Sequence, residues 1–302
     1  YNSVQSNTIC LAWQKAFGIE PATMGMVLTA LTLLIIFGGI HRVAKFSSTV
    51  VPVMAVVYLL IAVGVVVWNI TSLPKVLLTI VENAFGFNQA AGGVLGVTVI
   101  QGIKRGLFSN EAGEGSAPNA AAVATVSHPV KQGLIQALGV FTDTLVVCSC
   151  TAFIILVSGV DVSASNGIQL TQDALTHEIG SIGNPFVAVM IWLFAFSSII
   201  GNYYYGETNV RYIKDSKFGV FVYRLAVAAM VMTGAVVSLD FAWSFADITM
   251  ALLTLCNLVA IVLLSRQAVF LLQDYRKQKK EGRNPVFTKD KMPEIADKLE
   301  AW

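Results

Sequence analysis

Charged residues are scarce in this sequence of 302 residues: Asp, Glu, Lys and Arg together make up 13%, whereas hydrophobic residues make up 55%. So few charges cannot build a polar surface over so much apolar material, so lipid must solvate much of the chain. The net charge of +2 gives no electrostatic support to a nucleic-acid partner. The composition therefore predicts an all-α integral membrane protein with the lipid bilayer as a partner.

Cysteine and histidine are also few. Of the four cysteines, Cys148, Cys150 and Cys256 lie inside apolar runs, where packing is the expected role, so neither a disulfide nor a metal framework is predicted. The three histidines share no spacing, and the sequence has no GxSxG or HExxH stretch. These absences argue against an enzyme and against an organic cofactor. The chain opens at Tyr1 without an initiator Met or a signal sequence, so we expect an N-terminal part to be missing.

Long uncharged apolar runs are what the sequence has instead. Residues 23–40 and 47–68 are each long enough to cross a hydrocarbon core of about 30 Å, and they are predicted to form a helical hairpin. Weaker segments follow, each interrupted by glycine or by a single polar group. With the hairpin they predict about seven helices, the weaker ones at residues 90–103, 133–157, 185–205, 218–237 and 248–264.

The connections between these segments differ in charge. If residues 23–40 run inward, nearly all Lys and Arg fall in cytoplasmic connections, and only Lys15 and Lys75 fall outside. We therefore predict a multi-pass protein of the plasma membrane, with a transmembrane region at residues 1–265 and a basic cytoplasmic tail at residues 266–302. The first part of that tail either lies on the anionic inner leaflet or is solvated and ordered only in pieces.

The first polar interruption at membrane depth is FGFNQAAGGVLG, residues 85–96. Gly92 and Gly93 weaken a helix and free backbone groups that lipid cannot satisfy, which predicts a helix break compensated by an ion or a polar substrate. Close helix packing through Gly92 and Gly96, which are spaced as small-xxx-small, explains the same residues. The spacing alone leaves both interpretations open.

The second interruption is FAFSSIIGNYYYGE, residues 194–207. Ser197, Ser198 and Asn202 place hydroxyl and amide oxygens in the middle of an apolar segment, and helical spacing puts Ser198, Asn202 and Tyr205 on one face. Such oxygen ligands suit a hard, singly charged cation. Hydroxyls that bond back to a carbonyl of their own helix are the alternative.

Two further features concern charge. Residues 102–124, GIKRGLFSNEAGEGSAPNAAAVA, bring Glu111 near Lys104 and Arg105 in sequence, which indicates a gate or a coupling ion pair. An ordinary capped helix start at residues 116–118 is the alternative. Asp143 lies midway along residues 133–157, and an ionisable group at that depth is a functional hypothesis by default. The alternative is that the flanking threonines hold Asp143 in a helix contact.

Four stretches resemble those of one family. They are VQSNTICLAWQKAFGIEP, AFGFNQAAGGVLG, GIKRGLFSNEAGEGSAPNAAAVA and FAFSSIIGNYYYGET, and together they extend from Val4 to Thr208. In these stretches the sequence is similar to the alanine or glycine:cation symporters, also called sodium:alanine symporters. The resemblance implies a LeuT-like inverted-repeat transporter fold, here partial, with the last two helices of repeat one followed by repeat two. It also implies that a missing N-terminal half of the same protein carries the first broken helix.

The resemblance implies an activity as well: sodium-coupled symport of a small neutral amino acid, alanine or glycine, into a bacterial or archaeal cell. It places Ser197 and Ser198 at a sodium site. Because some relatives have Trp where this chain has Asn202, a wider pocket is implied and glutamine becomes a rival substrate. Two alternatives are compatible with the same residues. One is proton coupling through Asp143 or Glu111, and the other is a truncated membrane module that does not transport. The expected substrate-binding residues are Gly92, Gly93, Val94, Val97, Ser198 and Asn202.

Overall fold

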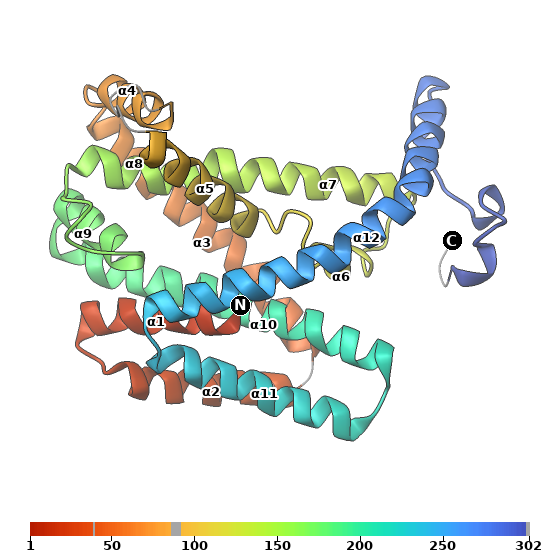
Figure 1. Cartoon of the computed structure of the whole chain (residues 1–302), viewed down its shortest axis with the longest axis horizontal. Coiled ribbons are helices and arrows are strands. Elements are labelled where there is room, and N and C mark those ends of the chain that lie inside the picture. Colours follow the sequence, from red (N-terminus) through yellow and green to blue (C-terminus); the bar gives the residue numbers. More distant parts are fainter. Residues whose placement is uncertain (39, 86–91, 300–302) are drawn as a thin grey trace. The chain divides into compact units, whose positions relative to one another are not determined.

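The computed structural model describes residues 1–38, 40–85 and 92–299, and within these ranges the chain is helical or irregular with no strand (Figure 1). For residues 40–50, 92–98 and 298 only the backbone is described. The predicted all-α class is confirmed. In chain order the elements are α1 (Asn2–Phe17), α2 (Pro21–Gly38), α3 (Ile40–Trp68), α4 (Leu73–Ala84), α5 (Gly92–Ser109), α6 (Ala117–Ala121), α7 (Pro129–Thr142), the π-helix η1 (Asp143–Cys148), α8 (Ser149–Ser158), α9 (Ile168–Ile179), the 3-10 turn η2 (Gly180–Ile182), α10 (Gly183–Ile213), α11 (Lys217–Val236), α12 (Leu239–Lys280) and the 3-10 turns η3 (Lys289–Lys291) and η4 (Ala296–Lys298).

Six segments of the described residues are long and apolar enough to cross a membrane. They match six of the seven predicted helices, and three of them, Pro129–Ser158, Ile168–Ile213 and Leu239–Lys280, extend further at both ends than the apolar runs from which they were predicted. The exception is the prediction at residues 90–103: α5 covers that region, yet it is not one of the six. The six segments are Pro21–Gly38, Val51–Trp68, Pro129–Ser158, Ile168–Ile213, Lys217–Val236 and Leu239–Lys280.

Two compact units make up the chain. Unit 1 consists of residues 1–106 and 145–249, and unit 2 consists of residues 107–144 and 250–302. Each unit joins stretches that are far apart in sequence. The helices α5 and α12 contribute residues to both units.

The interior of unit 1 is built around α10. One cluster joins α10, through Phe196 and Ile199, to α1, α2 and α11, and helices α1, α2 and α11 lie side by side (Figure 1). A second cluster joins α10, through Val187, to α3, α8 and α9. Because α10 supplies side chains to both clusters, it fixes the positions of the helices around it.

Polar side chains of α1 complete the end of α11. Ser6 Oγ donates to the Val231 carbonyl oxygen at 2.7 Å, and Asn7 Nδ2 donates to the carbonyl oxygens of Gly234 at 3.0 Å and Val237 at 2.8 Å. The last carbonyls of a helix have no partner within it, and at membrane depth water does not supply one. Asn7, which is 1% exposed, therefore caps α11 from a neighbouring helix.

The connection between α8 and α10, where the sequence predicted no helix, contains α9. In α9, Ala174 and Leu175 are fully buried against unit 1, and Lys15 of α1 pairs with Asp173 at 2.5 Å. The sequence did not predict α9 because this helix is short and contains many polar residues, so neither length nor apolar content marks it.

The close approach of α1 and α11 depends on Gly234. A Cβ atom at this position would lie 2.3 Å from the Ser3 carbonyl oxygen, which is backbone and cannot rotate away. We expect Gly234→Ala to lower the free energy of unfolding by about 1–3 kcal/mol, as overpacking does in other cores. The measurement is the thermal unfolding midpoint of the protein in detergent micelles.

Gly64→Ala in α3 is the matched control, because no described atom lies within 4 Å of the Cβ it would add. This substitution is expected to leave stability unchanged or to raise it by less than about 1 kcal/mol, since Ala favours a helix over Gly. Equal unfolding midpoints for the two variants would show that α1 and α11 do not approach as closely as described.

Candidate functional site

The predicted polar stripe of α10 exists as a separate face of that helix. Phe196 and Ile199 point into the core of unit 1, whereas Ser198 is exposed and Asn202 and Tyr205 are only half-buried. The stripe therefore lies outside the packed interior of unit 1. In an apolar segment long enough to span a membrane, polar groups in such a position require something other than lipid beside them.

The two serines make the local bonds that the sequence offered as an alternative. Ser197 Oγ donates to the Phe194 carbonyl oxygen at 2.7 Å, and Ser198 Oγ donates to the same oxygen at 3.2 Å. A hydroxyl that donates its single hydrogen keeps two lone pairs, and a sodium ion binds lone pairs. The local bonds thus orient both oxygens without using the part that a cation would bind. The sodium site at Ser197 and Ser198 stays a prediction.

Asn202 differs from the other polar residues of α10. Asn209 donates from its amide to the Tyr205 carbonyl oxygen at 2.7 Å, as the serines do to Phe194, but the amide of Asn202 has no hydrogen-bond partner among the residues that the structure describes. An amide offers two donors and one acceptor. Asn202 is therefore the side chain of this stripe best suited to meet a polar solute.

The glycine interruption lies between two helices. α4 ends at Ala84 and α5 begins at Gly92, and the connection, residues 86–91, lies outside the described residues. Gly92 and Gly93 thus form the first turn of α5, which begins two residues after the start of the helix predicted at residues 90–103. Val94 and Val97 follow on the same helix, and their backbone alone is described. The substrate contacts predicted for these residues stay predictions.

Asp143 begins the π-helix η1, which the sequence did not predict. Ser109 Oγ donates to Asp143 Oδ2 at 2.5 Å, and Thr144 Oγ1 donates to Asn110 Oδ1 at 2.7 Å, both within unit 2. The Thr142 hydroxyl donates to its own helix instead. π-Helical turns are rare and are frequently found at functional sites. The arrangement places a carboxylate, a carboxamide and two hydroxyls together at the end of α5 and the start of η1.

The loop after α5 packs tightly on α12 within unit 2. Asn257 Nδ2 donates to the Gly113 carbonyl oxygen at 2.9 Å, and Gly115, at φ +86°, leaves no room for a Cβ, which would lie 2.7 Å from the Asn257 carboxamide carbon. Glu111 accepts a hydrogen bond from Ser116 Oγ. Residues 110–116 therefore form an ordered loop in front of the short helix α6, which carries Pro in its first turn as the sequence indicated.

Lys104 and Arg105 have a partner that sequence reasoning missed. Arg105 Nη2 lies 2.8 Å from both carboxylate oxygens of Asp247 in unit 1, and Lys104 Nζ lies 3.9 Å from one of them. The Arg105 guanidinium also lies 4.2 Å from the centre of the Trp243 ring. The predicted pairing was with Glu111; the carboxylate that the structure supplies is Asp247. An acidic residue directly before the apolar run 248–264 was the available signal.

A cavity of about 340 Å³ opens in unit 1 beside a buried ion-pair network. Glu207, 8% exposed, accepts from Arg211 at 2.7 and 2.9 Å and from Arg224 at 3.3 and 3.4 Å. Arg224 also donates to the Tyr203 hydroxyl at 3.1 Å. The four-residue spacing of Glu207 and Arg211 on one helix was visible in the sequence, whereas Arg224 arrives from α11. The lining residues are Ile36, Tyr203, Tyr204, Glu207, Thr208, Arg211 and Arg224.

Comparison with known proteins decides what kind of molecule carries these groups. The family model described as the sodium:alanine symporter family matches residues 1–289. The chain belongs to the sodium:alanine symporter family. Proteins of this family are transporters and not enzymes, as the sequence predicted, and with the six apolar segments the match identifies a multi-pass membrane protein.

Three relatives in this family show how its members are named. The chain is 54% identical to the probable sodium/glutamine symporter GlnT of Bacillus subtilis over 96% of its length, 37% identical to the sodium/proton-dependent alanine carrier protein of Bacillus sp. (strain PS3) over 95%, and 35% identical to the sodium/alanine symporter AgcS of Methanococcus maripaludis over 94%. The matched parts cover 61%, 69% and 63% of these relatives. The chain thus spans between six and seven tenths of the length of these relatives.

The Glu207 network makes a testable contribution to the stability of unit 1. Glu207→Gln leaves the Arg224 guanidinium without its carboxylate in a partly buried place, and leaves Arg211 with only the exposed Asp215. We expect a loss of about 1–3 kcal/mol, less than for a fully buried pair because the Arg211 side chain is 46% exposed. Thermal unfolding in detergent micelles measures this loss.

Asp215→Asn removes the other carboxylate that pairs with Arg211, but this partner is 76% exposed. The expected loss is below about 1 kcal/mol, as for other solvent-screened pairs. If Asp215→Asn destabilised the protein as much as Glu207→Gln, burial of the network would not be the source of its stability.

Proposed function

We propose that this chain is the substrate- and sodium-binding part of a symporter that brings a small neutral amino acid, alanine or glycine, into the cell together with sodium. The observation that carries the proposal is the family match over residues 1–289. The oxygen-rich stripe of α10 supports it, because these groups lie outside the core of unit 1 in a segment long enough to cross a membrane. A co-transported cation and a polar solute are what such groups require.

The proposed sodium ligands are the hydroxyls of Ser197 and Ser198, and Asn202 is proposed to face the substrate. Both hydroxyls are oriented by the Phe194 carbonyl and keep their lone pairs. Gly92, Gly93, Val94 and Val97 are proposed to border the substrate at the start of α5. This arrangement corresponds to a LeuT-like inverted repeat, which we propose as the architecture, with the basic tail in the cytoplasm as the distribution of Lys and Arg indicates.

Glutamine is the second candidate substrate. The relative of 54% identity is named a probable sodium/glutamine symporter, and Asn202 adds amide chemistry where a side-chain amide would need a partner. Coupling to protons is a further possibility, because the carrier of Bacillus sp. (strain PS3) is named sodium/proton-dependent. We propose Asp143, which accepts a hydrogen bond from Ser109, as the residue that would bind the proton. A membrane module that does not transport by itself is the competing proposal for the chain alone.

Sodium is energetically sufficient for the proposed work. One positive charge crossing about 100 mV releases roughly 2.3 kcal/mol. A tenfold sodium gradient adds roughly 1.4 kcal/mol. Together they set a ceiling of about five-hundred-fold accumulation for one sodium ion per substrate.

Uptake into proteoliposomes tests the proposed function. An inward sodium gradient is expected to raise the uptake of radiolabelled alanine at least about tenfold over a potassium control, within the limit set by the gradient. A competition panel of alanine, glycine, serine and glutamine identifies the preferred substrate. AgcS of Methanococcus maripaludis, which is named a sodium/alanine symporter, is reconstituted in parallel as the positive control. Uptake by AgcS without any uptake by this chain would favour the non-transporting module.

Ser198→Ala tests the sodium site. Loss of one oxygen ligand is expected to raise the sodium concentration for half-maximal uptake by about three- to tenfold, corresponding to about one hydrogen-bond-strength contact. Ser198→Thr keeps the hydroxyl and is expected to restore the original value. An unchanged sodium dependence in Ser198→Ala would remove this residue from the site.

A further inference from the structure

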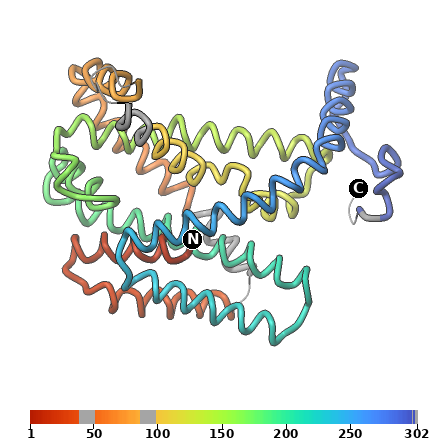
Figure 2. The backbone as a smooth tube through the Cα atoms, viewed as in Figure 1, coloured from red at the N-terminus to blue at the C-terminus, as the bar shows by residue number. Residues whose placement is uncertain are grey.

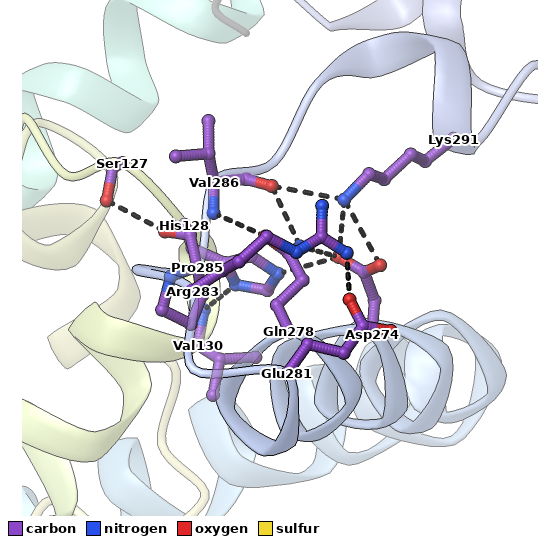
Figure 3. Close-up of polar contacts among 10 residues, drawn as sticks. All are labelled: Ser127, His128, Val130, Asp274, Gln278, Glu281, Arg283, Pro285, Val286 and Lys291. Atoms are coloured by element: carbon purple, nitrogen blue, oxygen red, sulfur yellow. Dashed lines mark hydrogen bonds and ion pairs between the residues drawn. The ribbon is translucent and has the colours of Figure 1, made fainter.

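The C-terminal segment of the chain folds back onto unit 2. The backbone turns at Gly282, at φ +73°, and residues 284–291 then run back beside the end of α12 (Figure 2). The close-up shows the side chains that meet there (Figure 3). The two arrangements predicted for the first part of the tail, on a leaflet or in solution, stay predictions; the structure shows that α12 continues to Lys280 and that Pro285 and Phe287 beyond it are buried.

The backbone of the segment is bound by side chains and by a backbone carbonyl of other parts of unit 2. Gln278 of α12 donates from Nε2 to the Val286 carbonyl oxygen at 2.9 Å and accepts from the Val286 amide at 3.0 Å. The Phe287 amide donates to the Ser127 carbonyl oxygen at 2.8 Å, and Ser127 Oγ donates to the Pro285 carbonyl oxygen at 3.0 Å. Main-chain bonds of this kind are how proteins hold extended peptides.

Two side chains of the segment are anchors. Pro285 is fully buried and Phe287 is 4% exposed, although the segment has no regular secondary structure at these residues. The Phe287 ring lies edge-on to the His128 ring at 5.9 Å, and Tyr275 of α12 meets the same ring at 5.3 Å. Backbone bonds together with alternate buried side chains are the pattern of a bound peptide ligand.

Asp274 is the electrostatic centre of the contact (Figure 3). Its carboxylate accepts from Lys291 of the segment at 2.8 and 3.1 Å and from Gln278 at 2.7 Å, and it lies 3.2 Å from His128 Nε2. His128, which is fully buried, accepts the Val130 amide on Nδ1 at 3.2 Å. This network assigns the ring proton to Nε2, which donates to Asp274.

We propose that Ser127, His128, Asp274 and Gln278 form a peptide-docking surface whose occupant is the chain's own segment 284–291, and that the segment detaches from it reversibly as a unit. The segment is held mainly through its backbone, by two anchors and by one lysine. A segment of eight residues, attached through a glycine turn, opens without disturbing the helices, because local units open independently of the rest of a fold. While docked, it fastens the start of α7 to the end of α12.

Acid is the expected signal for release. Burial lowers the pKa of the His128 imidazole below its ordinary value of 6.5, and the hydrogen bond to Asp274 offsets this only in part. The charged groups around the ring are Asp274 of α12, Lys291 of the segment and Lys131 of α7, and the lysines oppose a positive imidazolium. A second ring proton on Nδ1 would face the Val130 N–H, which is also a donor. The docked state is therefore fully favoured above about pH 6.5 and is lost as the pH falls through the lowered pKa.

Hydrogen–deuterium exchange on the full chain in detergent micelles tests the docking. At pH 7.5 the amides of Val286 and Phe287 are expected to be protected. Gln278→Ala is expected to raise their exchange rate about tenfold or more, because both Gln278 bonds to Val286 are lost. Gln273→Ala, on the same helix but exposed, is the matched control and is expected to change nothing. Unprotected amides in the wild-type chain, or equal rates in the two variants, would overturn the proposal.

The pH arm uses the same readout, corrected for the intrinsic pH dependence of exchange. The wild-type segment is expected to lose protection as the pH falls below about 6.5, through the lowered pKa of His128, whereas His128→Gln, which keeps a side-chain donor but does not titrate there, is expected to keep it. The amides of α1 and α11 report that each variant is folded. The same loss in His128→Gln would exclude His128 as the trigger.

A peptide added in trans tests whether the surface binds a peptide at all. Phe287→Ala weakens the binding of the chain's own segment to the docking surface. A fluorescent peptide of residues 283–292 is therefore expected to bind this variant at least about tenfold more tightly than the wild-type chain, whose segment competes at a high effective concentration. Adding Gln278→Ala to Phe287→Ala is expected to abolish this binding. Equal binding to all three chains would contradict the docking surface.

Discussion

The constraint on which the rest of this structure depends is that a hydrocarbon core offers no hydrogen-bond partners. Each polar group in a membrane-spanning segment must be satisfied by the protein or by what it carries. Thr32, in the interior of unit 1, donates to the carbonyl four residues earlier, and Asn7 of α1 closes the end of α11. The protein thus meets these needs both within one helix and between helices that are far apart in sequence.

The helix α10 has both a packed apolar face and a polar face outside the core. One of its faces supplies side chains to both apolar clusters of unit 1, so its position is fixed on both sides. The other face carries Ser198 and Asn202, which lie outside that packing. A helix held rigidly by one face can present oxygens on the other with little freedom to move, and rigid presentation is what selective binding of a small ion requires. Packing and chemistry are thus divided between two faces of one helix.

The sequence predicted the apolar segments well, because their signal is length and lack of charge, and lipid imposes both. It failed where a helix is stabilised by neighbours instead. α1 and α9 are short and polar, and they are helical in a context where Asn7 and Leu175 are buried by other elements. The π-helix at Asp143 likewise depends on bonds at its start, to residues more than thirty positions away in sequence. Nearest-neighbour patterns contain none of these partners.

At the candidate site, the sequence identified candidate residues but did not predict which side chains they contact. Ser197, Ser198 and Asn202 were identified from composition at depth, and their common face follows from helical spacing alone. The partner of Arg105 was predicted as Glu111 from proximity in the chain, and the structure supplies Asp247. An ion pair forms between residues that the fold brings together. Arg105 and Asp247 are 142 residues apart, and no periodic pattern in the sequence predicts a contact over that separation.

The same reasoning explains why the docked tail segment was invisible in the sequence. Residues 284–291 are polar and irregular apart from Pro285, Val286 and Phe287, a composition that ordinarily predicts a solvated tail. Two side chains order these residues. The Gln278 amide binds both the N–H and the carbonyl of Val286, and the buried His128 imidazole is held in one tautomer. Both depend on geometry between separate elements. A residue's chemical type shows what it is able to bind, and only the fold shows what it does bind.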